Sequence, residues 1–473
     1  MTTPAPSTMS KLNAVNEQIG KYRWTICALV FFATTINYLD RNVLGLLNPI
    51  LKAQGVFGAD PAAQEINYST VVICFTLAYA IGMVLAGRLI DWLGTKQGYA
   101  YSLIGWSLAA IGHAFGHHTW SFGFWRAALG LAESGNFPAA NKTIAEWFPK
   151  RERAFATGLY NSGANVGAIV APLCVPQIAA AWGWEWAFIL TGAVGLLWLV
   201  FWYRGYDSPD AKLRAGRLTQ AEYDHIHSDR DEQAANTGAK VSWFSLLKFR
   251  QTWAFVVGKF MTDGIWWFFL FWLPSYLAGE NARKVDAYLG AHPGFTGDKA
   301  AIPGVISWTL AVAIIYTIAT GGSIFGGWLP KKFMTGGMDA NRARKTSMFL
   351  FALLPLAVLA ASRLGAINTW LAVGCIAIAC SAHQAWSANI FTTVSDMFPK
   401  RAVASVTGIG GMAGALGGIL IARSAGVLLA HYTAQGHVEA GYAILFVACG
   451  SAYLIAWFIM HLLVPRFSQV KLD

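Results

Sequence analysis

Charged residues are scarce in this chain of 473 residues. Asp, Glu, Lys and Arg together make up 12% of the sequence, whereas hydrophobic residues make up 55% and the mean hydropathy is +0.44. Soluble domains carry about 25% charged residues. The composition therefore excludes an ordinary soluble globule and indicates a chain embedded in lipid.

Residues that build disulfides, metal centres and catalytic sites are also few. The six cysteines fall inside apolar stretches and none forms a Cys-x-x-Cys pair, which disfavours a disulfide framework or a thiolate metal site. His113, His117 and His118 have no carboxylate or cysteine beside them, so we interpret them as loop histidines. The sequence contains no nucleophile elbow, phosphate loop, His-Glu-x-x-His or haem motif. We expect no enzyme activity, no metal and no cofactor.

The net charge of +11, from 35 basic and 24 acidic residues, does not indicate nucleic-acid binding. The basic residues stand in short clusters between apolar runs, which is typical of membrane topology. The loops richest in Lys and Arg alternate with poorer ones. The positive-inside rule therefore predicts that both termini and the 204–250 segment are cytoplasmic.

Twelve apolar runs are long enough to span a bilayer, which takes about 20 residues. They lie near 23–50, 66–90, 98–117, 120–147, 154–181, 185–203, 251–278, 303–329, 346–362, 367–394, 402–430 and 438–464. Backbone hydrogen bonds must be satisfied within lipid, so runs of this length predict helices. We predict an all-α membrane protein with twelve transmembrane helices in two six-helix bundles.

A polar break divides the two sets of six runs. The predicted organisation is a cytoplasmic segment at 1–21, a first bundle at 22–204, a linker at 205–249, a second bundle at 250–465 and a cytoplasmic tail at 466–473. Within the linker, Thr219 is placed as the N-cap of a short helix and Glu222 as its capping-box partner.

One segment of the first half recurs in the second half. Glu146–Gly158 reads EWFPKRERAFATG and Asp396–Gly408 reads DMFPKRAVASVTG, with Phe-Pro-Lys-Arg and Thr-Gly in register. Each copy lies between two apolar runs. Internal repeats in so hydrophobic a chain are typical of secondary transporters whose site lies between two halves.

Asp40 and Arg41 interrupt the first apolar run, and Arg126 and Glu133 interrupt the fourth. Each costs about 2.5–3.5 kcal/mol at the centre of a membrane helix, so such residues usually mark a transport pathway. Arginine suits two-pronged binding of a carboxylate, while the acids can exchange protons. The alternative is a pair of structural ion pairs, Asp40–Arg126 or Arg41–Glu133.

Further polar residues in the runs are weaker site candidates. Asn37 shares a helix face with Arg41, Tyr79 could line a cavity or merely pack, and Asn165 could bind sugar hydroxyls. Asp263 is a candidate, although Lys259 four residues earlier is placed to pair with it. In the tenth run, only some of the polar residues can face a ligand; the candidates are His383, Gln384, Trp386 and Asn389.

The loop Gly87-Arg-Leu-Ile-Asp91-Trp-Leu-Gly94-Thr-Lys96 resembles the signature loop of the major facilitator superfamily. Trp92 and Thr95 depart from the pattern, at places that are usually basic. The resemblance implies a conformational motif formed by Gly87, Asp91, Gly94 and Lys96. In it, Asp91 meets the neighbouring bundle in the outward-open form.

Two further motifs are similar to the anion:cation symporter family within that superfamily. They are Tyr38-Leu-Asp40-Arg41 and the stretch RAALGLAESGNFPA that starts at Arg126. The segment AHQAWSAN, which begins at Ala382, looks most like the hexuronate branch. Ala164 follows Ser162-Gly163 where the galactonate branch tends to have glutamine, which disfavours an aldonate. By resemblance, Asp40 and Glu133 carry protons, and Arg41 and Arg126 attend the substrate carboxylate.

These observations predict a secondary transporter that takes up a sugar-acid anion such as a hexuronate together with protons, by alternating access. The resemblance implies a multi-pass protein of the bacterial inner membrane that works as a monomer. An aldonate or other organic-anion symporter is the alternative. A drug–proton antiporter is disfavoured because paired intramembrane arginines suit anions, although Gly163-x-x-x-Gly167 partly resembles the antiporter motif. No appended signalling domain is expected, which disfavours a non-transporting sensor.

Overall fold

The computed structural model describes the chain over residues 20–228 and 243–470, and within these ranges it contains helices and no strand. The first half comprises α2 (Tyr22–Ala53), α3 (Pro61–Leu93), α4 (Thr95–Gly112), α5 (Thr119–Glu133), α6 (Asn136–Trp147), α7 (Lys150–Trp182) and α8 (Trp184–Gly205). Between the halves lie α9 (Pro209–Arg214), α10 (Gln220–Ile226) and α12 (Trp243–Leu246). The second half comprises α13 (Arg250–Ala291), α14 (Trp308–Thr335), α15 (Ala340–Leu353), α16 (Ala361–Ile367), α17 (Thr369–Met397), α18 (Lys400–Ala434) and α19 (Val438–Leu463).

Within the described ranges, nine helical stretches are long and apolar enough to cross a membrane. The other three predicted spans are α2, α4 and the α5–α6 pair, and each has a physical reason for falling short. The α2 helix carries Asp40 and Arg41, α4 is short and begins with polar residues, and α5–α6 is interrupted. Two of these three spans, α2 and α5–α6, hold the four charges described below.

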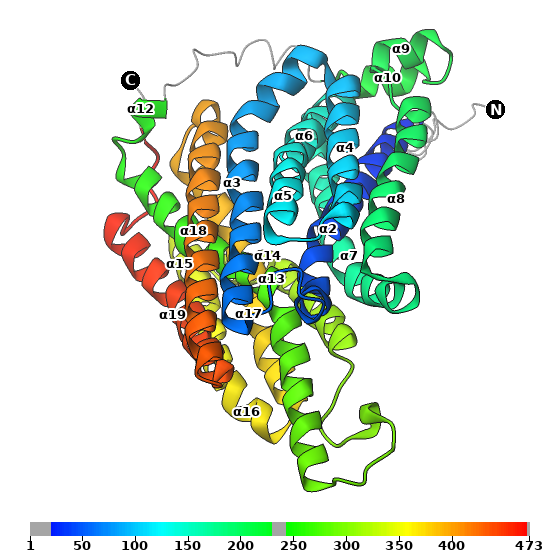
Figure 1. Ribbon diagram of the computed structural model, residues 1–473. Helices are drawn as coiled ribbons and strands as arrows, with labels where there is room; N and C mark the ends of the chain where they lie inside the picture. The colour runs from blue at the N-terminus through cyan, green and yellow to red at the C-terminus, as the bar shows by residue number, and fades with distance from the viewer. Residues whose placement is uncertain (1–19, 229–242, 471–473) are drawn as a thin grey trace, which may run out of the picture.

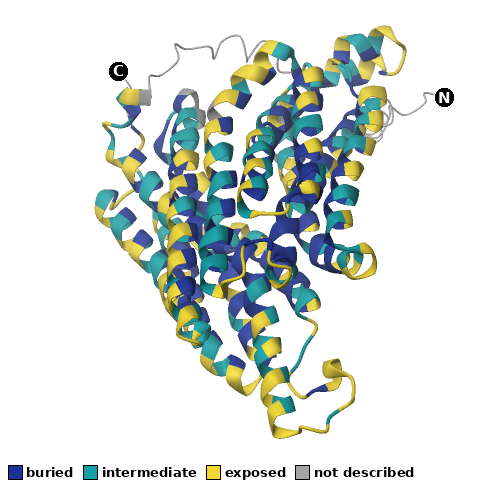
Figure 2. Ribbon diagram, viewed as in Figure 1, coloured by how far each residue is buried: buried dark blue, intermediate teal, exposed yellow. Residues whose placement is uncertain are grey.

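The helices form two bundles, as predicted from the two sets of six runs (Figure 1). In the first, α2 packs against α7, α3 against α5 and α4 against α8; in the second, α14 packs against α17 and α13 against α18 and α19. The bundles meet through α3 with α18, α2 with α13 and α7 with α14. Buried residues line the interior while exposed ones face outward (Figure 2), as expected for helices bathed in lipid.

The repeated segment has the same backbone in both halves. Pro149 precedes α7 with φ −65° and ψ 154°, and Pro399 precedes α18 with φ −64° and ψ 150°. Proline fixes φ and leaves no orphan N–H at a helix start. The fifth helix of each half therefore begins with the same backbone conformation.

Two of the predicted continuous helices are interrupted, and a proline accounts for each interruption. Helix α5 ends at Glu133 and α6 begins at Asn136, because Pro138 cannot donate to the Ser134 carbonyl four residues earlier. Likewise, Leu354–Ala360 forms a 3₁₀ turn around Pro355 between α15 and α16. A third departure is the length of α13, which continues to Ala291, beyond the predicted end at 278.

The linker contains the predicted short helix, but its acid has a different role from the one predicted. Thr219 Oγ1 accepts a hydrogen bond from Glu222 N (3.2 Å), which confirms the N-cap of α10. The Glu222 carboxylate instead accepts from the backbone N of Arg23 (3.0 Å) at the start of α2 and pairs with the Arg23 guanidinium (3.3 Å). The linker helix is thereby tied to the first bundle. Parts of the predicted terminal segments and linker, at 1–19, 229–242 and 471–473, lie outside the described residues.

Glu152 at the start of α7 joins the same cluster. It accepts from Arg23 Nε (2.9 Å) and contacts His225 Nε2 (2.8 Å). Burial alone would raise the Glu152 pKa, but these two hydrogen bonds hold it below its ordinary value. The carboxylate thus stays ionised and bridges α2, α7 and α10.

The acid that ends the fourth span of each half is held by a different partner in each copy. In the first half, Glu146 accepts from Thr95 Oγ1 (2.6 Å) at the start of α4 and from the Tyr206 hydroxyl. Burial and the neighbouring Glu146 raise the pKa of Tyr206, so its hydroxyl remains a donor. In the second half, Asp396 forms an ion pair with Arg344 of α15 (2.9 Å). Thr95, which stands where the family pattern usually has a positively charged residue, thus makes the equivalent contact through a neutral hydroxyl group.

Candidate functional site

The four intramembrane charges converge between α2 and α5. Arg41 pairs with Glu133, with its Nη2 2.8 Å and its Nε 2.9 Å from Oε2 of the carboxylate. Arg126 donates from Nη2 to the backbone carbonyl of Arg41 (3.2 Å). All four side chains are buried: Asp40 is 1% exposed, Arg41 3%, and Arg126 and Glu133 0%.

A glycine allows α5, which carries two of the four charges, to approach α3 closely. A Cβ at Gly130 would lie 2.4 Å from the Phe75 carbonyl oxygen and 3.1 Å from the Tyr79 N. Gly130 stands midway between Arg126 and Glu133, so the close helix approach falls at the centre of the charge cluster. A larger residue there would push α5 away from α3.

The charge cluster is only partly satisfied. Neither Asp40 carboxylate oxygen has a hydrogen-bond partner in the described part of the chain, and the same holds for Arg126 Nε and Nη1 and for Glu133 Oε1. The two acids and two arginines sum to zero when all are ionised. Of the two structural ion pairs considered above, Arg41–Glu133 forms, whereas Asp40 and Arg126 make no ion pair within the described ranges.

Aromatic rings enclose both guanidinium groups. The Arg41 Cζ lies 4.8 Å from the ring centroids of Tyr38 and Tyr79 and 5.4 Å from that of Trp267. Arg126 Cζ lies 4.9 Å from the Phe75 centroid and 5.5 Å from that of Phe271. Aromatic faces attract cations, more strongly where water is excluded. The second bundle therefore covers a site built on the first.

Two hydrogen bonds join the bundles beside this site. The Tyr68 hydroxyl donates to the Phe271 carbonyl (2.7 Å), and Asn48 Nδ2 donates to Ser275 Oγ (2.8 Å). Tyr68 lies on α3 and Asn48 lies on α2, so each hydrogen bond connects one helix of the first bundle to α13 of the second. The two bundles are therefore in direct contact beside the charge cluster.

The remaining first-half candidates differ in how firmly they are held. Asn37 is buried and accepts from Arg41 Nη2 (3.4 Å), and Tyr79 stacks on Phe75 with centroids 5.8 Å apart. Asn165 lies half-buried on α7 and makes no hydrogen bond within the described ranges. Its amide is thus available to another group.

Most second-half candidates have partners within the protein. Asp263 pairs with Lys259 (2.6 Å), as their spacing predicts, and His383 contacts the Tyr453 hydroxyl (2.7 Å). Asn389 donates to the Gly326 and Ala385 carbonyls (2.7 and 2.8 Å), which fixes α17 against α14.

Gln384 and Trp386 complete the candidates on α17. Gln384 accepts from Ser323 Oγ (3.4 Å) at the limit of a hydrogen bond. Trp386 is fully buried, and its Nε1 has no partner among the described residues. These two retain more capacity for a ligand than Asn389, whose donors are used.

The residues of the Gly87–Lys96 loop lie away from the charge cluster. Asp91 pairs with Lys142 of α6 (2.8 Å) and Lys96 with Asp207 (2.9 Å), while Gly94 has φ 77° between α3 and α4. A Cβ at Gly87 would meet nothing within 4 Å. In this structure the Asp91 carboxylate is bound within its own half.

Trp267 and Phe271, which cover the arginines, were not among the residues predicted from the sequence. Six of the seven residues at 266–272 are aromatic, and that density was the available signal. Aromatic residues are common in apolar spans, so the pattern alone did not distinguish these rings from lipid-facing ones. Among the described residues, no group of three or more His, Cys, Asp and Glu side chains could hold a metal ion.

An all-helical, membrane-spanning architecture with buried, charge-balanced residues at the junction of two bundles defines a membrane transporter, and the comparisons with known proteins agree. Residues 30–422 match the family model of the Major Facilitator Superfamily. The chain belongs to the Major Facilitator Superfamily.

Several curated relatives carry transporter names. The chain is 30% identical to the hexuronate transporter of Escherichia coli (strain K12) over 87% of this chain and 88% of the relative. It is 27% identical to the D-galactonate transporter of Escherichia coli O6:H1, with 95% and 97% covered. The galacturonate transporter of Dickeya chrysanthemi is 32% identical over 57% of this chain and 77% of its own. The chain is therefore a transporter and not an enzyme.

Solved structures share the fold at low sequence identity. The partially occluded inward-open form of the xylose transporter XylE from E. coli superposes with a TM-score of 0.68 at 15% identity, covering 96% of this chain and all of that one. An inward-facing bacterial homologue of the human lysosomal transporter Spinster gives a TM-score of 0.67 at 16% identity, covering 95% and 98%. These likenesses confirm the predicted fold class.

Proposed function

We propose that this protein takes up a sugar-acid anion, such as a hexuronate, together with protons. Relatives named for hexuronate, galacturonate and galactonate support the substrate class. All three anions combine one carboxylate with several hydroxyls, so a site for them needs fixed cations and neutral hydrogen-bonding groups.

The proposal rests mainly on Arg126, whose buried N–H groups are not all hydrogen-bonded. Its side chain is fully buried, yet Nε and Nη1 have no partner among the described residues. A buried guanidinium with N–H groups that lack an acceptor suits a carboxylate, which accepts charge-assisted hydrogen bonds. Leaving it unpaired is costly, so a bound anion would stabilise the site.

The charge balance of the site couples substrate binding to protonation of the two acids. An arriving carboxylate competes with Glu133 for Arg41 and brings a negative charge close to Asp40. Both effects favour protonation of the acids, and by linkage protonation favours substrate binding. The loaded site then carries little net charge, so the two bundles can rock past one another by alternating access. No ATP is required.

We assign Asp40 and Glu133 to proton coupling and Arg41 and Arg126 to the carboxylate. Further substrate contacts are assigned to Asn37, Tyr79, Asn165, Asp263, His383, Gln384, Trp386 and Asn389, with Gly87, Asp91, Gly94 and Lys96 as the conformational motif. The proposed setting is a bacterial inner membrane with both termini cytoplasmic. The protein is proposed to work as a monomer, with bundles at 22–204 and 250–465.

An aldonate or another organic anion is the main alternative substrate, since relatives with such names align over most of the chain. A drug–proton antiporter is less well supported. Gly163 and Gly167, which resemble the antiporter motif, are explained by packing, because a Cβ at either would lie 2.4 Å from an α2 carbonyl oxygen.

Proteoliposomes would test the proposal directly. Radiolabelled glucuronate or galacturonate should accumulate above its external concentration when the external pH is lower than the internal pH. Collapse of the pH gradient should reduce uptake to equilibration. Accumulation driven by a Na⁺ gradient alone, at equal pH, would contradict proton coupling, and absence of sugar-acid binding would contradict the substrate class.

Asn165→Ala should weaken binding of sugar acids while leaving proton-driven accumulation intact at saturating substrate. Loss of one neutral hydrogen bond costs about 0.5–1.5 kcal/mol, so the apparent affinity should fall roughly two- to tenfold. Competition of unlabelled glucuronate, galacturonate and galactonate against labelled substrate measures the change. Unaltered affinity for all three would remove Asn165 from the specificity set.

A further inference from the structure

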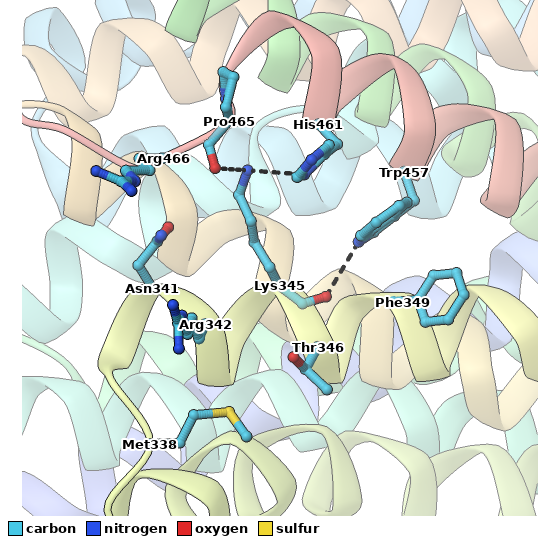
Figure 3. A pocket seen from close by; sticks show the side chains of 10 residues that line it. All are labelled: Met338, Asn341, Arg342, Lys345, Thr346, Phe349, Trp457, His461, Pro465 and Arg466. Atoms are coloured by element: carbon cyan, nitrogen blue, oxygen red, sulfur yellow. Dashed lines mark hydrogen bonds between the residues drawn. The ribbon is translucent and has the colours of Figure 1, made fainter.

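A basic cavity of about 430 Å³ lies in the second bundle, at the end where α15 begins and α19 finishes (Figure 3). Both helices belong to stretches apolar enough to span the membrane. The lining residues are Met338, Asn341, Arg342, Lys345, Thr346, Phe349, Trp457, His461, Pro465 and Arg466. The cavity is far in sequence from the four central charges, and the transport mechanism does not use it.

The lining carries positive charge without compensation. It includes Arg342, Lys345 and Arg466 but no Asp or Glu. Asp339, just before α15, accepts from the backbone N of Asn341 (3.1 Å) and of Arg342 (3.4 Å), so it caps the helix.

The walls of the cavity are held in place by hydrogen bonds. Lys345 Nζ donates to the Pro465 carbonyl (2.6 Å), and Trp457 Nε1 donates to the Lys345 carbonyl (3.1 Å). The segment after α19 is fastened by Phe467 N to Asn341 Oδ1 (3.0 Å). The cavity is therefore shaped before any ligand arrives.

The guanidinium groups of Arg342 and Arg466 remain free. Both residues are exposed, and neither side chain makes a hydrogen bond or ion pair within the described ranges. Lys345 is already occupied by carbonyls, so these two arginines are the groups able to bind an anion. Arginine is suited to phosphate because its planar fork matches two phosphate oxygens.

Apolar side chains are exposed on the two helices that form the cavity. Phe349 is 36% exposed on α15, and Phe458 and Leu462 are 57% and 62% exposed on α19. The Trp457 ring packs on Phe349, with centroids 4.8 Å apart, and tryptophan is enriched at membrane–water interfaces. A ligand here meets cations at one end and hydrocarbon at the other.

We propose that this cavity binds the headgroup of an anionic phospholipid. Arg342 and Arg466 hold the phosphate, and the acyl chains run along Phe349, Phe458 and Leu462. Basic pockets between membrane helices at the cytoplasmic side bind such headgroups through the same combination of charge and apolar surface. A free phosphate would use the arginines but not the apolar residues, which is why the lipid is favoured.

Native mass spectrometry of the purified full-length protein would test this site. Phosphatidylglycerol should remain bound to the wild type more strongly than phosphatidylethanolamine with the same acyl chains. In the double variant Arg342→Ala/Arg466→Ala, phosphatidylglycerol binding should fall by roughly tenfold or more. Arg342→Lys/Arg466→Lys should retain part of the binding, because charge survives without the fork.

The matched control is Lys331→Ala/Lys332→Ala, which removes two charges at the same end of α14 but outside the cavity. It should bind phosphatidylglycerol like the wild type, and all variants should elute as the same species in gel filtration. Equal loss in the control and the Arg342/Arg466 variant would overturn the proposal. So would equal binding of both lipids, or displacement of the lipid by equimolar glycerol 3-phosphate, which carries the phosphate without acyl chains.

Discussion

Arg126→Ala is expected to abolish uptake of sugar acids while the protein still folds and inserts. The substitution removes the buried guanidinium to which the substrate carboxylate is proposed to bind. Removing one partner of a buried charge pair costs about 2–5 kcal/mol, a loss of affinity of roughly 30-fold to several thousand-fold. Substrate binding to purified protein and uptake into proteoliposomes would both be measured.

Arg126→Lys provides the matched control, because it keeps the charge but not the planar fork. It should rescue uptake poorly. Gel filtration and thermal unfolding show whether each variant retains the fold. Near-normal substrate affinity in a folded Arg126→Ala protein would refute the role assigned to this residue.

Glu133→Gln is expected to separate substrate movement from proton movement. Glutamine imitates the protonated acid at nearly the same size, so the site should remain in its substrate-accepting form. Exchange between equally loaded compartments should survive, whereas uphill accumulation driven by a pH gradient should disappear. Parallel exchange and accumulation assays on one preparation of proteoliposomes would measure the two activities.

A structural role for the Arg41–Glu133 pair gives a different result for the same substitution. Loss of a purely structural ion pair would lower expression and reduce exchange and accumulation together. Asp40→Asn tests whether a second acid shares the task, since coupled acids need not titrate separately. Proton symport through these acids is excluded if both variants still concentrate substrate when only a pH gradient is supplied.

The fold was largely predictable because it depends on hydrophobic length and an internal repeat. Membrane helices must satisfy their own backbone hydrogen bonds, so twelve apolar runs leave few alternatives. The helix breaks at Ser134–Gly135 and Leu354–Ala360 follow from Pro138 and Pro355. Apolar length alone did not indicate them, although the prolines are visible in the sequence.

The candidate site was only partly predictable. Helical spacing placed Arg41 beside Asn37, and the structure brings the charges of the two runs together. Which acid meets which arginine depends on how α5 and α2 pack in three dimensions, and Gly130 sets only the approach of α5 to α3. The cover formed by Trp267 and Phe271 depends on the docking of the second bundle, which no local pattern encodes. Glu222 was misassigned because its partner, Arg23, is 199 residues away.

Glu146 at the end of α6 and Asp396 at the end of α17 make equivalent contacts with different partners. We expect these two contacts to respond differently to ionic strength. Arg344 and Asp396 are 20% and 31% exposed, so dissolved ions can screen their attraction, which is worth about 0–1 kcal/mol at such a site. Glu146 instead accepts hydrogen bonds from the neutral hydroxyls of Thr95 and Tyr206, which salt screens much less. High salt is therefore expected to weaken the Arg344–Asp396 contact more than its counterpart at Glu146.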